Sequence, residues 1–231
     1  IFLGADHGGY IKRMNAAIEA LTEGDAKYSV KLCQMVKLIS NGKPLKMSKR
    51  SGDFVTLSEM VDQVGSDSIR FMMLYRKNEA PLEFDFQKVT EQSKDNPVFY
   101  VQYAHARISS VLRKLDEHKL KFNLSDFTDC KFNLLNSEHE LDLIKKILDW
   151  SSVIITSVNL YEPHRIAYYL YELASSFHSL WNQGKIDTKL KFINEEDLDV
   201  TYARLSLIIA TQKTIKSGLD LLGVSAPNEM Q

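Results

Sequence analysis

With 231 residues, the chain can hold one large domain or two modest ones. Its net charge of −1 gives no overall sign of nucleic-acid binding, so any anion site must be local. Two cysteines are too few for a disulfide scaffold and lack metal-ligand spacing, and no apolar run reaches membrane-spanning length. We therefore expect a cytoplasmic protein with no membrane partner and no protein-bound metal site.

Strands and helices alternate in the first 90 residues. The predicted elements are a strand at 1–3, a helix at 10–21, a strand at 30–39, a helix ending at 64 that Thr56 or Ser58 caps, and a helix at 67–75. Residues 77–89 predict an irregular connector. This alternation is typical of an α/β fold with a parallel sheet.

The periodicity becomes helical after residue 90. It predicts four helices, at 96–115, 141–158, 165–181 and 202–222, and Pro97 stands in the first turn of the first of them. We place a boundary between residues 88 and 96. The predicted domains are an α/β part over residues 1–90 and an all-α helical bundle over residues 91–231.

A basic loop, "GKPLKMSKRSG" at residues 42–52, follows the predicted strand at 30–39. The segment "LGADHGGY" follows the first strand, and ligands of open α/β sheets bind at the carboxyl ends of strands. Both segments are therefore expected at one crevice, where Gly4 leaves room for a flat ligand and Gly8 and Gly9 permit a tight turn. The cluster of Lys46, Lys49 and Arg50 suits a polyphosphate. A solvated basic loop is the competing interpretation.

The helix expected at 96–115 has two distinct lines of side chains. One is an apolar stripe at helical spacing: Val101, Ala104, Ile108, Val111, Leu112 and Leu115. The other contains Tyr100, Tyr103 and Arg107, which could stack unpaired RNA bases and neutralise a phosphate. The alternative is that both tyrosines border the core with wet hydroxyl groups.

Several segments resemble one family. "KMSKR" and "GADHGGY" resemble the lysine loop and the strand-end segment of class I aminoacyl-tRNA synthetases. Three further segments resemble the C-terminal helical domain of arginyl-tRNA synthetases: "NPVFYVQYAHARISSVLRKL", "LYELASSFHSLWNQGK" and "ARLSLIIATQKTIKSGLDLLGVSAPNEM". The resemblance runs over essentially the whole chain. It implies a Rossmann-like catalytic domain, represented here by its C-terminal portion, followed by a helical anticodon-binding domain.

The resemblance also implies an activity. Members of this family activate arginine with ATP, assisted by Mg²⁺, and transfer the arginyl group to arginine tRNA. In this chain Lys46 and Lys49 match the lysines that stabilise the phosphates, and Met47 and Ser48 belong to the same loop. Three more positions are implied to bind ATP or the aminoacyl-adenylate: Gly4, His7 and Gln34.

The resemblance implies a tRNA surface on the helical part as well. Its expected residues are Tyr100, Tyr103, Arg107, Trp181 and Met230. Core packing beside Phe177 is the alternative for Trp181, and a frayed tail is the alternative for Met230. His105 and His178 receive no role, and the acidic run at 195–199 is expected to be a solvated loop and helix start.

The family's "HIGH"-type motif has no match in the sequence. We therefore expect the chain to be the C-terminal part of a ligase, a monomer that is inactive by itself. A non-catalytic tRNA-binding fragment or paralogue is the alternative, although an intact "KMSKR" favours the ligase. Another nucleotidyl transferase is a weaker alternative, since the helical domain argues against it.

Overall fold

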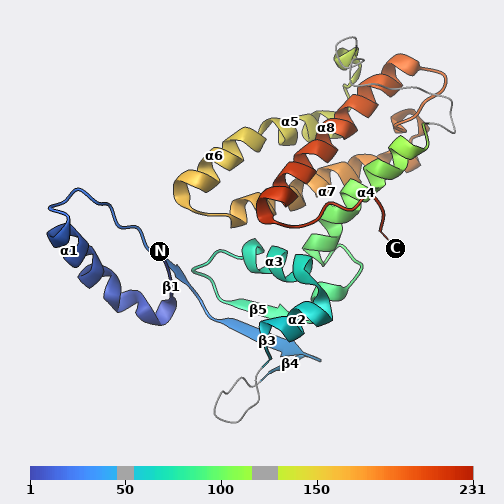
Figure 1. The fold of residues 1–231 in the computed structure, drawn as a ribbon. Coiled ribbons are helices and arrows are strands. Elements are labelled where there is room, and N and C mark those ends of the chain that lie inside the picture. Colours follow the sequence, from blue (N-terminus) through green and yellow to red (C-terminus); the bar gives the residue numbers. More distant parts are fainter. Residues whose placement is uncertain (46–54, 116–129, 231) are drawn as a thin grey trace.

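A computed structural model of the chain describes residues 1–45, 55–115 and 130–230. Helices dominate, and the few strands lie in the first 85 residues. Figure 1 shows an N-terminal arm with α1 and β1, a small sheet beside α2 and α3, and a group of long helices. No helix in the described part of the chain is long and apolar enough to cross a membrane.

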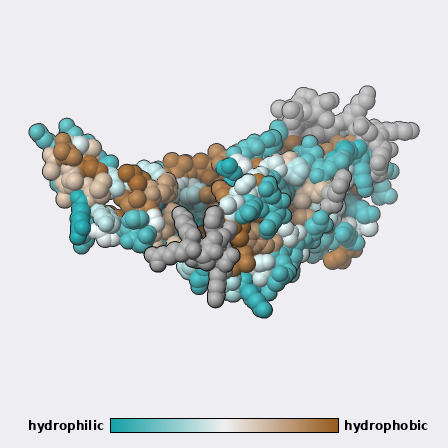
Figure 2. Space-filling model, turned by 60° about the horizontal axis from the view of Figure 1, so that its bottom comes forward, coloured by the Kyte–Doolittle hydropathy of each residue, from teal (hydrophilic) through white to brown (hydrophobic). Residues whose placement is uncertain are grey.

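The N-terminal arm is a β–helix–β unit. Strand β1 (Phe2–Gly4) pairs in parallel with β2 (Lys31–Cys33), and Gly4 lies opposite Cys33. The chain between them forms a 3₁₀ helix, η1 (Ala5–Tyr10), and then α1 (Ile11–Leu21). Apolar surface is visible on this arm (Figure 2). The side chains of Phe2 and Leu21 are among the exposed apolar ones.

A second sheet has β3 (Val36–Ser40) at its centre. It pairs with β4 (Lys43–Pro44) in antiparallel and with β5 (Leu82–Asp85) in parallel orientation. The single strand expected at 30–39 is therefore wrong. The chain leaves one sheet and enters the other at residues 34 and 35, and the backbone N–H of Gln34 donates to the carbonyl of Asn78 at 2.7 Å.

The connector expected at 77–89 is also wrong. It contains β5 and a short 3₁₀ helix, η2 (Lys88–Thr90). Strand β5 has only four residues and its partner is more than 40 residues away in sequence, so the local pattern could not reveal the pairing. Phe84 of this strand is completely buried.

Helices α2 (Leu57–Val64) and α3 (Ser66–Tyr75) cover this second sheet. Thr56 caps α2 as expected, with a reciprocal capping box to Glu59. Together the sheet and the two helices bury a small core of Leu38, Met60, Ile69, Phe84 and Val89.

The remaining helices form a bundle with its own, larger core. They are α4 (Pro97–Arg113), η4 (Phe132–Leu134), α5 (Glu138–Leu148), α6 (Trp150–Leu160), α7 (His164–Ile186), η5 (Thr188–Leu190) and α8 (Leu198–Leu222). The single helix expected at 141–158 is wrong, because the chain forms two helices that meet at Asp149.

The apolar stripe expected on α4 is confirmed. Val101, Ala104 and Ile108 have no exposed surface. Helix α7 packs against α4, α5, α6 and α8, and Gly218 of α8 approaches Leu170 closely: a Cβ there would lie 2.6 Å from a Leu170 methyl carbon. The expected helix stop is confirmed too, since Gly223 ends α8 in the left-handed conformation at φ 67°.

Candidate nucleic-acid interface

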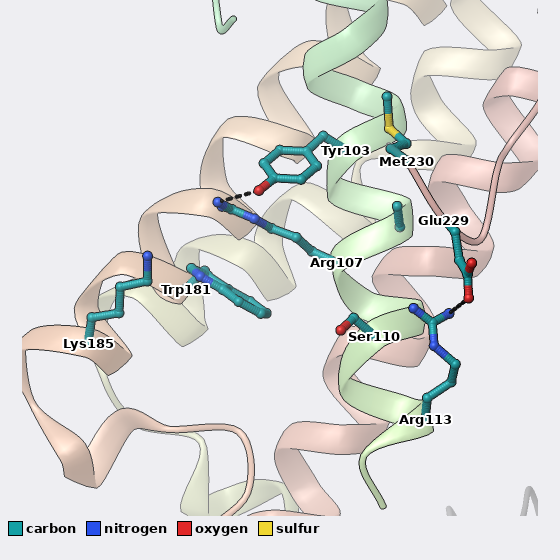
Figure 3. A pocket seen from close by; sticks show the side chains of 9 residues that line it. Tyr103, Arg107, Ser110, Arg113, Trp181, Lys185, Glu229 and Met230 are labelled. Carbon is teal, nitrogen blue, oxygen red and sulfur yellow. Dashed lines mark hydrogen bonds and ion pairs between the residues drawn. The ribbon is translucent and has the colours of Figure 1, made fainter. Parts of the chain in front are cut away.

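A cavity of about 600 Å³ lies between α4, α7 and the C-terminal tail (Figure 3). We call it the α4–α7 cleft. Its lining comes from three segments: Tyr103, Ala106, Arg107, Ser110 and Arg113 of α4, Trp181 and Lys185 of α7, and Glu229 and Met230 of the tail. Four of the five tRNA-binding residues expected from the sequence therefore meet here: Tyr103, Arg107, Trp181 and Met230.

Arg107 is held between two aromatic rings. Its guanidinium carbon lies 4.2 Å from the ring centroid of Tyr103 and 5.1 Å from that of Trp181. Its Nη2 also donates to the Tyr103 hydroxyl group at 3.1 Å. Cation–π contacts and a hydrogen bond fix the guanidinium, so little of its conformational freedom would be lost on binding an anion.

His178 anchors the same guanidinium from the interior. Nη1 of Arg107 donates to Nδ1 of His178 at 3.1 Å, and Nε2 of His178 donates to the Tyr100 carbonyl at 3.2 Å. Only the neutral tautomer with its proton on Nε2 allows both bonds. Burial lowers the pKa of His178 to about 4, although the Tyr100 carbonyl acts in the opposite direction and the Arg107 charge adds to the shift. His178 is therefore neutral near pH 7.

The C-terminal tail is tied to α4 and carries Met230 to the cleft. His105 Nδ1 donates to the Pro227 carbonyl at 2.9 Å, and burial lowers the pKa of this histidine. Ser109 Oγ donates to the side-chain oxygen of Asn228 at 3.1 Å, and Arg113 donates to the Asn228 carbonyl at 3.2 Å. These bonds fix the tail as far as Asn228, two residues before Met230.

Positive charge dominates the cleft. Arg107, Arg113 and Lys185 line it with one carboxylate, that of Glu229, which lies 3.5 Å from Arg113. Within the described ranges no carboxylate forms an ion pair with Arg107 or Lys185. Aromatic faces beside cations that lack acidic partners can stack an unpaired base and neutralise a phosphate.

Tyr100 does not line this cleft. Its ring packs against the bundle core, 4.4 Å from the ring centroid of His178 and 5.2 Å from that of Tyr171. Four residues near Arg107 had no function expected from the sequence: His178, Lys185, Arg113 and Glu229. One signal was available, because His178, Trp181 and Lys185 repeat on α7 the i, i+3, i+7 spacing of Tyr100, Tyr103 and Arg107 on α4.

The expected nucleotide-binding residues lie at the ends of the first strand pair. Gly4 ends β1 beside Cys33, Gln34 directly follows β2, and His7 stands in η1. All three are exposed. Gly8 and Gly9, expected in a tight turn, lie in the same 3₁₀ helix.

The lysine loop with Lys46, Met47, Ser48, Lys49 and Arg50 lies outside the described residues. In the ranges that are described, no group of three or more His, Cys, Asp or Glu side chains is placed to hold a metal ion.

Comparison with known proteins decides the family. The model of the DALR anticodon binding domain matches residues 101–230, which is more than half of the chain. The chain belongs to the DALR anticodon-binding domain family. The α4–α7 cleft lies entirely within the DALR region, so the resemblance expected for the helical part is confirmed.

Curated relatives extend the likeness to the whole chain. An arginine–tRNA ligase of Rhizobium rhizogenes is 53% identical over 231 residues, and one of Parvibaculum lavamentivorans is 55% identical over 230 residues. Each alignment covers 99% of this chain but 39% of the relative. The chain therefore spans about two fifths of the length of these relatives.

Solved structures agree with the described fold. A Campylobacter jejuni protein named as a candidate arginyl-tRNA synthetase is 32% identical with a TM-score of 0.81, and the match covers 99% of this chain and 47% of that chain. The Thermus thermophilus arginyl-tRNA synthetase is 23% identical with a TM-score of 0.69, over 99% of this chain and 40% of that chain. At that identity the second match supports the fold alone.

Proposed function

We propose that the chain is the C-terminal part of an arginine–tRNA ligase. Residues 91–231 bind the anticodon region of arginine tRNA, and residues 1–90 belong to a Rossmann-like catalytic domain that uses arginine, ATP and Mg²⁺. The ligase would join arginine to ATP as arginyl-adenylate and then transfer it to the tRNA. The observation that carries the proposal is the arrangement of Arg107 between Tyr103 and Trp181 inside a DALR domain.

The geometry of that arrangement supports RNA as the ligand. Neutral His178 accepts from Arg107 without cancelling its charge, so the cation remains available to a phosphate. The tyrosine and indole rings line the cleft on either side of this cation, so a base can contact an aromatic and cationic surface there. No described carboxylate pairs with Arg107, so no acidic side chain of the described residues neutralises its charge.

The architecture of the first 90 residues supports a catalytic role for this part. Two pairs of parallel strands are present, and the carboxyl ends of β1 and β2 carry Gly4, His7 and Gln34. Strand β4 lies within the basic segment at 42–52, and Lys46 and Lys49 come after it in the sequence. In the proposed ligase, further parts of the longer protein would cover the exposed apolar side chains of Phe2, Leu21 and Met35.

Separate hydrophobic cores support the proposed division into two domains. The smaller core lies within residues 38–89, and the larger core is built almost wholly from residues beyond 97. Phe71 of α3 is the exception, because it is completely buried in the larger core. Helix α3 therefore attaches the α/β part to the bundle.

A binding experiment tests the RNA half of the proposal. The chain is titrated with arginine tRNA and with a tRNA for another amino acid at several salt concentrations. Tyr103→Ala should weaken binding by about 1–3 kcal/mol at every salt concentration, because stacking depends little on salt. Arg107→Ala should make the salt dependence shallower by up to roughly one unit. Tyr161→Ala serves as the control, since Tyr161 is exposed at the end of α6, away from the cleft.

Unchanged affinity in both cleft variants, with unchanged melting curves, would place the RNA surface elsewhere. Loss of folding in Tyr103→Ala would instead make the tyrosine a core residue.

Exchange of pyrophosphate into ATP tests the catalytic half. In the longer ligase, Lys49→Ala should lower kcat by about 10²–10³-fold with a smaller effect on arginine binding, because the lysine contact strengthens as charge develops on the phosphates. Lys46→Ala should behave alike. The 231-residue chain by itself should show no exchange. If both variants raise only the KM for ATP, the loop is a binding element and not a catalytic one.

A further inference from the structure

A second cavity, of about 740 Å³, adjoins the α4–α7 cleft. We call it the η5 cavity, because the turn that contains η5 forms one of its walls. Ser110, Trp181 and Lys185 line both cavities, so the two are continuous. Figure 3 shows Lys185 one turn along α7 from Trp181, at the end of the cleft away from Tyr103. Of the tRNA-binding residues expected from the sequence, Trp181 alone also lines this cavity.

The wall of the η5 cavity is rigidly built. Arg204 is buried, and its Nη1 donates to the carbonyl groups of Lys189 and Lys191 at 2.5 and 2.9 Å. Its Nε donates to the carboxylate of Glu140 at 2.7 Å. Gly184 lets the turn approach α7, since a Cβ there would lie 3.0 Å from the Leu190 carbonyl oxygen. These contacts fix the backbone at Lys189 and Lys191, two of the residues that line the cavity.

The interior of the cavity is apolar and aromatic. Phe192 is buried, and its ring centroid lies 5.9 Å from that of Trp181. Further apolar side chains complete this surface: Val111, Leu190 and Ile193. Trp181 is only partly buried, so one indole contributes to both cavities. A planar, uncharged group of the size of a nucleobase suits such a surface.

Charge at the same cavity favours an anion. Four exposed lysines line it: Lys114, Lys185, Lys189 and Lys191. Two carboxylates, those of Glu195 and Glu196, also line it, which leaves a surplus of two positive charges. No described carboxylate forms an ion pair with any of the four lysines.

We propose that the η5 cavity binds a second unpaired nucleotide of the same RNA, with the base on its apolar floor and the neighbouring phosphates on Lys189 and Lys191. This inference rests on the proposed RNA-binding function of the α4–α7 cleft. Trp181 separates the two nucleotides, so each base contacts the indole from its own cavity. The η5 cavity would thus add a second nucleotide contact next to the Arg107 site, formed by the helices and the turn already described.

A salt titration and a phosphate scan test the proposal. The whole 231-residue chain is titrated with a hairpin RNA that carries the anticodon stem and loop of an arginine tRNA. The double variant Lys189→Gln/Lys191→Gln is compared with Lys27→Gln/Lys145→Gln, which removes two exposed lysines that line neither cavity. Two lost phosphate contacts should make the slope of log K against log salt shallower by about 1.4, since each contact of a single strand contributes about 0.7.

The phosphate scan locates the contact. Single loop phosphates are replaced by neutral methylphosphonates. At one or two positions the replacement should weaken binding to the wild-type chain but not to the Lys189→Gln/Lys191→Gln variant, because the contact is already lost. An abasic nucleotide next to those positions should weaken wild-type binding by about 5–150-fold, as expected for one stacked base.

The outcomes separate this inference from the proposed function. One outcome would refute only the η5 proposal. In it, Lys189→Gln/Lys191→Gln keeps the wild-type salt slope, each methylphosphonate weakens its binding as much as that of the wild type, and Tyr103→Ala still weakens binding. The η5 cavity is then not a nucleotide site, and the proposed anticodon site stands. If the wild-type chain binds the hairpin no better than an unrelated hairpin, and Tyr103→Ala changes nothing, both proposals fall.

Discussion

Replacing Arg204 with methionine should strongly destabilise the bundle. Only 6% of the Arg204 side chain and 1% of the Glu140 side chain are exposed, and their ion pair spans 2.7 Å. Arg204→Met leaves the Glu140 carboxylate buried without its cation, a change that typically costs about 3–5 kcal/mol. For a protein of this length, each kcal/mol lowers the melting temperature by roughly 2–4 °C. We therefore expect a fall of about 6–20 °C in thermal unfolding followed by circular dichroism.

The pH dependence of the same variant adds a second test. Burial alone would raise the pKa of Glu140, but hydrogen bonds from Arg204 and Ser137 and the Arg204 charge outweigh it and hold the pKa below its usual value. A carboxyl group with a lowered pKa contributes stability above its unfolded pKa of about 4.3 and loses it as the pH falls through the folded value. In Arg204→Met, burial without the cation raises the pKa of Glu140, so the difference in stability between wild type and variant should shrink as the pH falls toward about 4.3 and go on shrinking below it.

An exposed ion pair of similar length provides the control. Lys131 lies 2.6 Å from Asp199, but both side chains are more than half exposed. Lys131→Met should leave the melting temperature nearly unchanged, because solvent screens such pairs. The double variant Glu140→Leu/Arg204→Met should be less destabilised than Arg204→Met, since no charge is left buried. If Arg204→Met melts like Lys131→Met, or if the double variant is worse than the single one, the buried pair does not stabilise the bundle.

Three further outcomes follow from the same geometry. The pKa of His178 is lowered to about 4, so between about pH 6.5 and 4 the unfolded chain binds a proton that the folded chain does not. The free energy of unfolding should therefore fall as the pH drops through this range. In a pH series of urea titrations, His178→Gln should reduce this dependence by up to one proton. Gly184→Ala should lower the melting temperature, because the new Cβ would lie only 3.0 Å from the Leu190 carbonyl oxygen. Without that contact, alanine would raise the melting temperature, because it has a higher helix propensity than glycine. Gly218→Ala should cost about 1–3 kcal/mol in the same titrations, because the fully buried Leu170 leaves its Cβ no room.

Local patterns were sufficient to predict the long helices. Helix α4 begins at Pro97, one residue after the expected start, because Asn96 caps it and proline suits its first turn. The apolar stripe of α4 likewise has helical spacing along one segment. Separating α5 from α6 was not possible in this way, since apolar spacing continues through Asp149 and the change of direction depends on packing against α7.

Strand pairing and the composition of the cleft depended on contacts that no local pattern contains. Nothing in the sequence around Phe84 shows that β5 completes a sheet with β3. Arg107 and Tyr103 could be paired from helical spacing, yet His178 reaches Arg107 from another helix, 71 residues away. Trp181 and Met230 were expected beside them only through the family resemblance. A cleft that three separate segments build becomes visible only when the fold brings them together.

The C-terminal tail connects the α4–α7 cleft to the α/β part. Asp67 of α3 accepts hydrogen bonds from the backbone and hydroxyl of Ser225 and from Gln102 of α4. Three residues later the tail bonds Ser109 and Arg113 of α4, and it then delivers Met230 to the cleft. Helix α3 itself contributes to both cores. A shift of α3 against α4 must therefore break the Asp67 contacts or move the tail, so the position of Met230 depends on how the α/β part is seated on the bundle.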